Sequence, residues 1–199
     1  MAFSSVPLRM GIAGYMGAGK STCSSLLSAK LGMMVVDADA EAKVLMENDG
    51  RVKNELAIAF GPTIARKGVI DFKVLGNIAF SSSSEMEKLN RIVHSRLVRR
   101  LQDLICSSPN NCILDAALIP LWGIEAWFDS CIWVVASRSK RIERVQERTG
   151  LPEDRVRQRM TMQEALMAEP KGRSWTFIYN EGSRDELSAL LDACGINRP

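Results

Sequence analysis

The chain has 199 residues, 46% of them hydrophobic and 25% charged, which is typical of one soluble globular domain and excludes a disordered or collagen-like chain. The net charge of +3 is too small to indicate a nucleic-acid partner, and no apolar run approaches the ~18 residues needed to span a membrane. The five cysteines form no Cys-x-x-Cys pair, and a lone His94 cannot supply a histidine cluster for zinc, so we expect reduced thiols in a cytoplasmic protein.

Five short apolar runs have the character of strands, and helical patterns separate them. The runs are nearly continuous, as expected for strands whose two faces are both buried. Strands that alternate with helices predict an α/β fold with a parallel sheet covered on both sides. The expected strands are residues 8–13, 33–36, 112–114, 131–136 and 175–179.

A glycine-rich segment follows the first expected strand and matches the P-loop pattern G-x-x-x-x-G-K-[ST]. Glycines let the backbone turn tightly and bring its N–H groups up to phosphate oxygens, and the helix expected over 22–31 directs its positive end at the same place. Lys20 can then reach the β- and γ-phosphates of a nucleotide, and the Ser21 hydroxyl can bind Mg²⁺. The residues expected to bind the nucleotide here are Gly14, Met16, Gly17, Ala18, Gly19, Lys20, Ser21 and Thr22.

Carboxylates lie at the ends of the second and third expected strands, at the edge of an open α/β sheet that faces the ligand crevice. Asp37 and Asp39 follow the second strand, and Asp115 follows the third. A carboxylate there can accept a proton from the hydroxyl group of an acceptor or contact Mg²⁺ through water, which favours a kinase. Two alternatives stay open: Asp39 as the N-cap of a helix over 40–46, and Asp115 as an acid in a strand-end turn.

Residues 40–107 contain helical patterns and no convincing strand, so we predict a helical insert between the second and third strands. A capping box of Ser84 and Glu87 is expected to open a long amphipathic helix there, because the hydroxyl and the carboxylate then satisfy each other's backbone donors. A second capping box, Ser183 with Glu186, is expected to open the last helix of the chain.

Basic residues outnumber acidic ones between 138 and 160, beginning in a helix expected over 139–148. Arg144 and Arg148 are four residues apart and share one face of that helix. An arginine that closes over the γ-phosphate stabilises the transition state of phosphoryl transfer, whereas the alternative is a solvated face whose arginines pair with nearby glutamates. The residues after this helix, 149–174, are predicted to form a lid that excludes water.

Other nucleotide-binding classes fit the chain less well. A GTPase would carry an N-K-x-D element after a late strand, and the sequence has none. A motor or transport ATPase would need more than one short domain. A small-molecule or nucleotide kinase therefore leads, with an ATP-binding regulator that has lost phosphoryl transfer as its rival.

Motifs in the same order along most of the chain make it similar to the dephospho-coenzyme A kinase family. The D-A-D element together with the L-N-x-x-x-H element is far more specific than the P-loop, which many kinases share. The matching segments are residues 37–43 (DADAEAK) for D-A-D-x-x-A-R, 89–94 (LNRIVH) for L-N-x-x-x-H, Arg144 and Arg148 for R-x-x-x-R, Gln163 for a lid glutamine, and 180–182 (NEG) for N-x-G.

The resemblance implies ATP-dependent phosphorylation of the ribose 3′-hydroxyl of 3′-dephospho-CoA, the last step of coenzyme A biosynthesis. It also implies a P-loop kinase core with a five-stranded parallel sheet, an inserted helical substrate-binding domain and a lid. The corresponding ranges are 6–39, 108–148 and 175–199 for the core, 40–107 for the insert and 149–174 for the lid.

In that picture Asp39 is the catalytic base, and Lys20 and Arg148 neutralise the moving phosphoryl group. Arg144 and Asn180 bind the nucleotide, Asn180 near its adenine. The expected partners are ATP, Mg²⁺ and 3′-dephospho-CoA, with no nucleic acid and no membrane, and the expected state is a monomer. No chemistry is assigned to His94.

Overall fold

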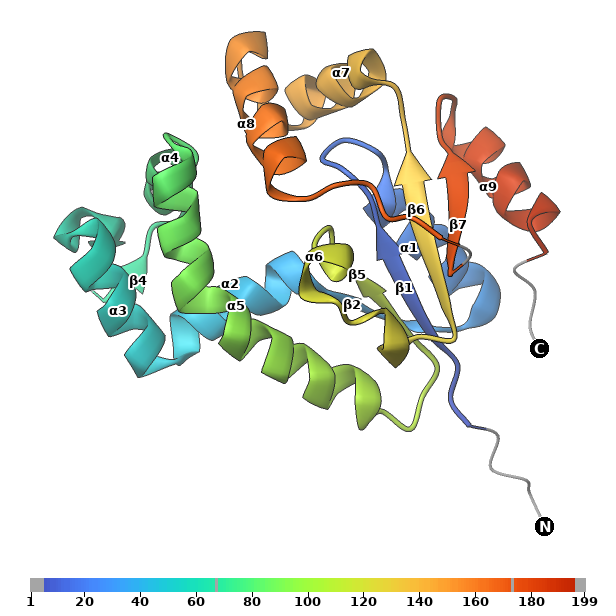
Figure 1. Ribbon diagram of the computed structural model, residues 1–199, viewed down its shortest axis with the longest axis horizontal. Helices are drawn as coiled ribbons and strands as arrows, with labels where there is room; N and C mark the ends of the chain where they lie inside the picture. The colour runs from blue at the N-terminus through green and yellow to red at the C-terminus, as the bar shows by residue number, and fades with distance from the viewer. Residues whose placement is uncertain (1–5, 67, 173, 196–199) are drawn as a thin grey trace. The chain divides into compact units, whose positions relative to one another are not determined.

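The computed structural model describes residues 6–66, 68–172 and 174–195 (Figure 1). These described residues form two compact units. The sheet unit contains the residues up to Asp37 and those from Leu104 onward, and the helical unit is Ala38–Asp103. Within the described ranges, no helix combines the length and apolar character needed to cross a membrane.

A parallel sheet organises the sheet unit. Among the described residues it has five strands, in the order β2 (Met34–Asp37), β5 (Cys112–Asp115), β1 (Arg9–Ala13), β6 (Ser130–Val135) and β7 (Trp175–Tyr179). Each pair of neighbours is parallel. The predicted strands and the predicted α/β class with a five-stranded parallel sheet are therefore confirmed, with strand ends that differ from the expected ones by about one residue.

Helices cover both faces of this sheet, which explains why its strands read as continuous apolar runs. On one face, α1 (Lys20–Leu31) and α9 (Arg184–Ala193) pack against the strands (Figure 1). The buried side chains of this layer are Met10, Ile12, Ala18, Cys23, Leu27, Met33, Ile113, Ile132, Val134, Ile178, Leu187 and Leu191. On the other face, Ile119 of α6 (Ile119–Trp122) and Phe128 lie against Gly11, where a side chain would collide with the Phe128 ring.

The expected end of α1 at residue 31 and the expected Ser183 cap of α9 are confirmed. α1 ends at Gly32, whose φ of 65° is left-handed and whose N–H donates to the Ser28 carbonyl. Ser183 caps α9 by accepting a hydrogen bond from the Glu186 N–H. α7 (Arg138–Thr149) and α8 (Glu153–Leu166) form a hairpin between β6 and β7, so the basic helix lies where it was predicted.

The helical unit contains α2 (Ala38–Asn48), α3 (Gly50–Phe60), α4 (Phe72–Ala79) and most of α5 (Ser83–Cys106). Asp49 and Asp71 cap α3 and α4 by accepting from backbone N–H groups of the first helical turn. The unit also holds a short antiparallel pair, β3 (Ala65–Arg66) and β4 (Val69–Ile70), which sequence reasoning missed. Strands of two residues are too short to show an alternating pattern.

One expectation about a helix start in this unit is wrong, and one alternative that the sequence left open is excluded. α5 is capped by Ser82, whose hydroxyl accepts from the Glu85 N–H at 3.2 Å, and not by Ser84. The serine run contains two overlapping S-x-x-E frames, and the sequence alone does not separate them. α2 begins at Ala38, so Asp39 lies inside its first turn and is not its N-cap.

Candidate active site

The loop between β1 and α1 holds its glycines in conformations that other residues rarely adopt. The φ angles of Gly14, Gly17 and Gly19 are 149°, 81° and 98°. Each glycine also touches a neighbouring segment, because a Cβ atom there would collide with the Val134 carbonyl, the Arg141 carbonyl or the Asn180 side-chain amide respectively. The glycines therefore let this phosphate loop (residues 14–21) lie directly against β6, α7 and the segment after β7.

The segment that follows β7 is fastened to the phosphate loop. The side-chain amide of Asn180, only 5% exposed, donates to the Ala18 carbonyl at 2.8 Å. The Arg144 guanidinium donates to the carbonyls of Asn180 (3.0 Å) and Gly182 (3.1 Å). The structure thus brings Arg144 and Asn180, both predicted to bind nucleotide, to one place beside the loop.

Glu181, in the same segment, is a residue that sequence reasoning missed. Its carboxylate accepts from the backbone N–H and the hydroxyl of Ser137, at 2.5 and 2.7 Å. Ser137 is the residue before α7, and a carboxylate is stabilised at the N-terminus of a helix. The signal that could have found Glu181 is an acid directly after the last strand, but its partner lies 44 residues earlier in the chain.

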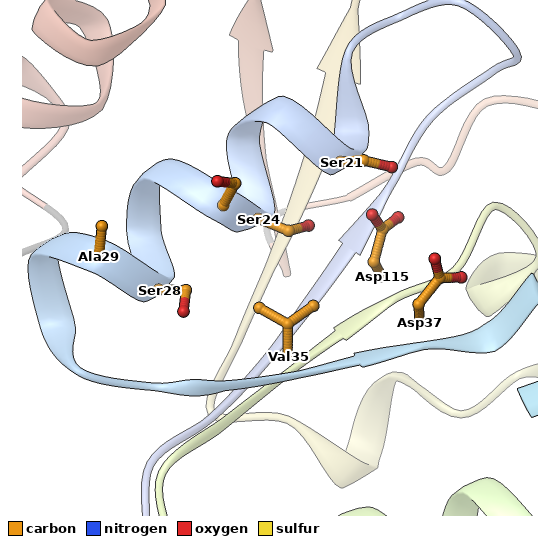
Figure 2. Close-up of a pocket in the computed structure, with 8 residues that line it drawn as sticks. Ser21, Ser24, Ser28, Ala29, Val35, Asp37 and Asp115 are labelled. Atoms are coloured by element: carbon orange, nitrogen blue, oxygen red, sulfur yellow. The ribbon is translucent and has the colours of Figure 1, made fainter. Parts of the chain in front are cut away.

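Asp37 and Asp115 stand side by side near the start of α1. They are paired residues in the register of β2 and β5, at the carboxyl ends of these strands. Figure 2 shows the Ser21 hydroxyl on the same side as their carboxylates. They line one end of a cavity of about 430 Å³, which continues along α1 past Ser24 and Ser28 above Val35.

The two carboxylates differ in burial: Asp115 is only 6% exposed, whereas Asp37 is exposed to solvent. Burial raises the pKa of Asp115, while the Lys20 ammonium and hydrogen bonds from Ser21 and Ser24 partly offset the rise. Burial, together with the Asp115 carboxylate, also raises the pKa of the neighbouring Cys23 thiol to about 12. The Cys23 thiol therefore stays protonated and serves only to fill the core. The charge of Asp115, in contrast, depends on the positive groups that lie beside it.

Oxygen donors of this kind suit Mg²⁺, which keeps much of its water and uses one or two carboxylates together with phosphate oxygens. Ser21, Asp115 and Asp37 supply a hydroxyl and carboxylates at the start of α1. In the described part of the chain, no three His, Cys, Asp or Glu side chains are grouped so as to hold a metal ion. The residues present therefore fit a metal bound jointly with a phosphate ligand.

Other predicted site residues lie at element ends. Lys20 is the first residue of α1, and Thr22 is in its first turn. Arg148 is exposed in the last turn of α7. Asp39 is exposed in the first turn of α2, within the helical unit. His94 belongs to α5 and is half-buried, and burial lowers its pKa.

Comparisons with known proteins identify a family and a fold. The family model for dephospho-CoA kinase matches residues 8–186. The chain is 33% identical to the dephospho-CoA kinase of Geobacillus kaustophilus over 92% of this chain and 93% of that protein. The crystal structure of TT1252 from Thermus thermophilus matches with a TM-score of 0.67 and 29% identity, over 94% of this chain and 96% of the other. A Campylobacter jejuni dephospho-CoA kinase shares the fold, with a TM-score of 0.57, 16% identity and 96% of both chains covered.

Proposed function

The chain belongs to the dephospho-CoA kinase family, and from this premise we propose that it transfers the γ-phosphoryl group of ATP to the ribose 3′-hydroxyl of 3′-dephospho-CoA. The products are ADP and coenzyme A. The observation that carries the proposal is the phosphate loop with Ser21 and Asp115 beside the start of α1, in a chain whose family match covers residues 8–186. ATP is the donor that this loop suits, because backbone N–H groups and Lys20 can surround its β- and γ-phosphates.

We assign nucleotide binding to residues of the phosphate loop and of the start of α1, and to the segment after β7 that is hydrogen-bonded to the loop. The assigned residues are Gly14, Met16, Gly17, Ala18, Gly19, Lys20, Ser21, Thr22, Arg144 and Asn180. Asn180 closes one side of the loop through the Ala18 carbonyl, and Arg144 holds the backbone of residues 180–182. This support fixes the segment before the nucleotide arrives. A preorganised site loses less conformational freedom on binding, and that favours affinity. Asn180 is the residue assigned to the side of the adenine.

Ser21 would hold Mg²⁺ directly, and Asp115, with Asp37 beside it, would hold its water ligands. The ion supplies positive charge that offsets the negative charge of the phosphates during transfer. Asp115 contributes its carboxylate in the ionised form, which the nearby Lys20 ammonium favours. Asp37 is the last residue of the neighbouring strand β2 and is exposed. Its carboxylate therefore reaches solvent and can orient water there.

Asp39 is assigned as the base. The 3′-oxygen of the acceptor forms a bond to the γ-phosphorus, the bond from that phosphorus to the β–γ bridging oxygen breaks, and the proton of the hydroxyl passes to the Asp39 carboxylate. Its exposure in the first turn of α2 leaves the carboxylate accessible to an acceptor. General base catalysis of this kind contributes about 10² to 10⁴ in rate.

Lys20 and Arg148 are assigned to neutralise the negative charge of the transferring phosphoryl group. Residues 149–174 are assigned to exclude water from the site, since hydrolysis competes with transfer. We further propose that residues 40–107 bind the acceptor and that the chain acts as a monomer in the cytoplasm.

The test is an acceptor panel. The protein is incubated with ATP, Mg²⁺ and one acceptor at a time: 3′-dephospho-CoA, adenosine, AMP or gluconate. Release of ADP with 3′-dephospho-CoA alone supports the proposal. Release with another acceptor identifies a different kinase, and ATP binding without turnover identifies a regulator. Lys20→Ala is the background control, and Lys30→Ala, at the far end of the same helix, is its matched surface variant.

A further inference from the structure

The hairpin of α7 and α8 contacts consecutive residues of the phosphate loop (Figure 1). The Arg141 guanidinium lies over the Tyr15 ring, 5.2 Å from its centroid. The Met16 N–H donates to the Gln163 side-chain oxygen at 2.6 Å. Gly17 lies against the Arg141 backbone, where a Cβ atom would collide with the carbonyl. These contacts lie at residues 15–17, where the series of N–H groups that faces phosphate in a P-loop begins.

Packing fixes the position from which Gln163 reaches the loop. Met160, one turn earlier on α8, is fully buried against Val156 and against Ile142 and Val145 of α7. The Met16 side chain packs on the same cluster. Residues three apart on a helix share a face, so the burial of Met160 directs Gln163 at the Met16 backbone. The hydrogen bond therefore connects two elements that are already seated on each other.

The next residue, Glu164, secures the same helix through a buried arginine. Arg141 is 8% exposed at its side chain and donates to the Glu164 carboxylate at 2.6 Å, and Arg138 lies 3.5 Å from the other carboxylate oxygen. Among the described residues, the Nε and Nη1 atoms of Arg141 have no hydrogen-bond partner. A buried guanidinium with one carboxylate partner is costly to leave unpaired, so Glu164 holds α8 in register with α7.

We propose that Gln163 is a positioning residue for ATP: its side-chain oxygen holds the Met16 peptide so that the following N–H groups of the loop converge on the phosphates. This inference rests on the proposed function, because it takes ATP as the ligand of the loop. Without the Gln163 side-chain oxygen as hydrogen-bond acceptor, the Met16 peptide is free to rotate. The N–H groups of the phosphate loop then have to be ordered when ATP binds. That ordering costs affinity for the phosphates and not for the adenosine part.

The test is Gln163→Met, which keeps the length of the side chain and removes the acceptor. We expect kcat/KM for ATP to fall about tenfold, the scale of one lost hydrogen bond, while KM for 3′-dephospho-CoA stays unchanged. The inhibition constant of AMP against ATP is also expected to stay unchanged, because AMP lacks the β- and γ-phosphates. Gln158→Met, on the same helix, removes a side-chain oxygen that accepts from Arg155; it is the matched control and should behave as wild type.

Gln163→Asn is the second variant, because its shorter side chain falls short of Met16 and the same selective loss is expected. Wild-type kcat/KM for ATP in both variants would overturn the inference, as would equal weakening of ATP and AMP, which indicates only a structural role. The proposed function fails on a different result, namely a wild-type protein that binds ATP but gives no product with 3′-dephospho-CoA. Parallel melting curves show whether each variant is folded.

Discussion

Asp115 and Asp37 occupy paired positions on neighbouring strands but differ in burial. The buried carboxyl has a raised pKa, and the Lys20 ammonium and serine hydroxyls around it favour its charge again. Such a group destabilises the free protein and gains from a bound cation. A site that is strained when empty and relieved by its ligand is a common compromise between stability and activity.

Replacing Asp115 is therefore expected to raise stability and lower activity. Because the folded-state pKa of Asp115 is raised above the unfolded value of ~3.9, the native state binds more protons between these two values, and stability is lost as pH rises through that window. Asp115→Asn removes this loss, so the variant should exceed wild type in unfolding free energy at pH 7 and match it near pH ~4. Urea unfolding at both pH values measures this. The exposed Asp37→Asn serves as control, and equal changes in both variants would contradict the role of burial.

Asp39 is assigned a chemical role, and its replacement is expected to affect turnover and not nucleotide binding. Asp39→Asn keeps the size and polarity of the side chain but cannot take a proton. We expect kcat to fall about 100-fold or more, with the dissociation constant of ATP within twofold of wild type. Glu47→Gln, exposed on the same helix, is the matched control. Near-normal turnover by Asp39→Asn would remove it from the mechanism.

At the scale of elements, α7 supports the site through the arginines on its length. Arg141 lies over Tyr15, and Arg144 holds the backbone beyond β7. Arg148 follows one turn later on the same helix and is exposed. One helix thus supports the phosphate loop near its start and extends a solvated arginine near its end.

Arg148 is the exposed member of this series, and its removal tests whether it meets the transferring group. Arg148→Ala is expected to lower kcat by about 100-fold, less than the 10³ to 10⁵ attributed to some arginine fingers, because Lys20 remains. KM for ATP should change little. Arg157→Ala, which breaks an exposed ion pair of α8, controls for loss of surface charge. Wild-type kinetics in Arg148→Ala would return this arginine to a solvated helical face.

The start of α5 is a second property of an element that can be measured. Ser82→Ala removes the hydroxyl that accepts from the Glu85 N–H and should cost about 1 kcal/mol of unfolding free energy. Ser84→Ala lies inside the helix and should be neutral or slightly stabilising, because alanine has the higher helix propensity. Denaturant unfolding of the two variants side by side decides between them. A larger loss in Ser84→Ala would restore the cap predicted from the sequence.

For the whole molecule, the predictable parts of the fold are those whose pattern lies in residues close together in the sequence. Strands of a parallel sheet are buried on both faces, so each appeared as an uninterrupted apolar run. Gly32 and Ser183 mark helix ends within three or four residues of the contacts they make. The β3–β4 pair and the cap of α5 were not predictable in this way, because two-residue strands and overlapping serine frames carry no distinct pattern.

In the same way, one part of the site was predictable from the sequence and another part was not. The phosphate loop is contiguous, so its motif could be recognised in a single sequence. The contacts that hold it are not contiguous: Met16 meets Gln163 across 147 residues, and Ala18 meets Asn180 across 162. The burial of Asp115 depends on how α1 lies over β5, which no local pattern records. A motif thus identifies the ligand-binding loop, and only the folded chain identifies its supports.

The central claim concerns one hydroxyl group, and an acceptor that lacks it gives the most direct measurement. The protein is given ATP, Mg²⁺ and either 3′-dephospho-CoA or its 3′-deoxy analogue, and product is identified by mass and by ³¹P NMR. We predict coenzyme A and an equal amount of ADP from the first acceptor and no phosphorylated product from the second. Phosphorylation of the 3′-deoxy analogue, or no transfer to 3′-dephospho-CoA by a protein that binds ATP, would contradict the claim.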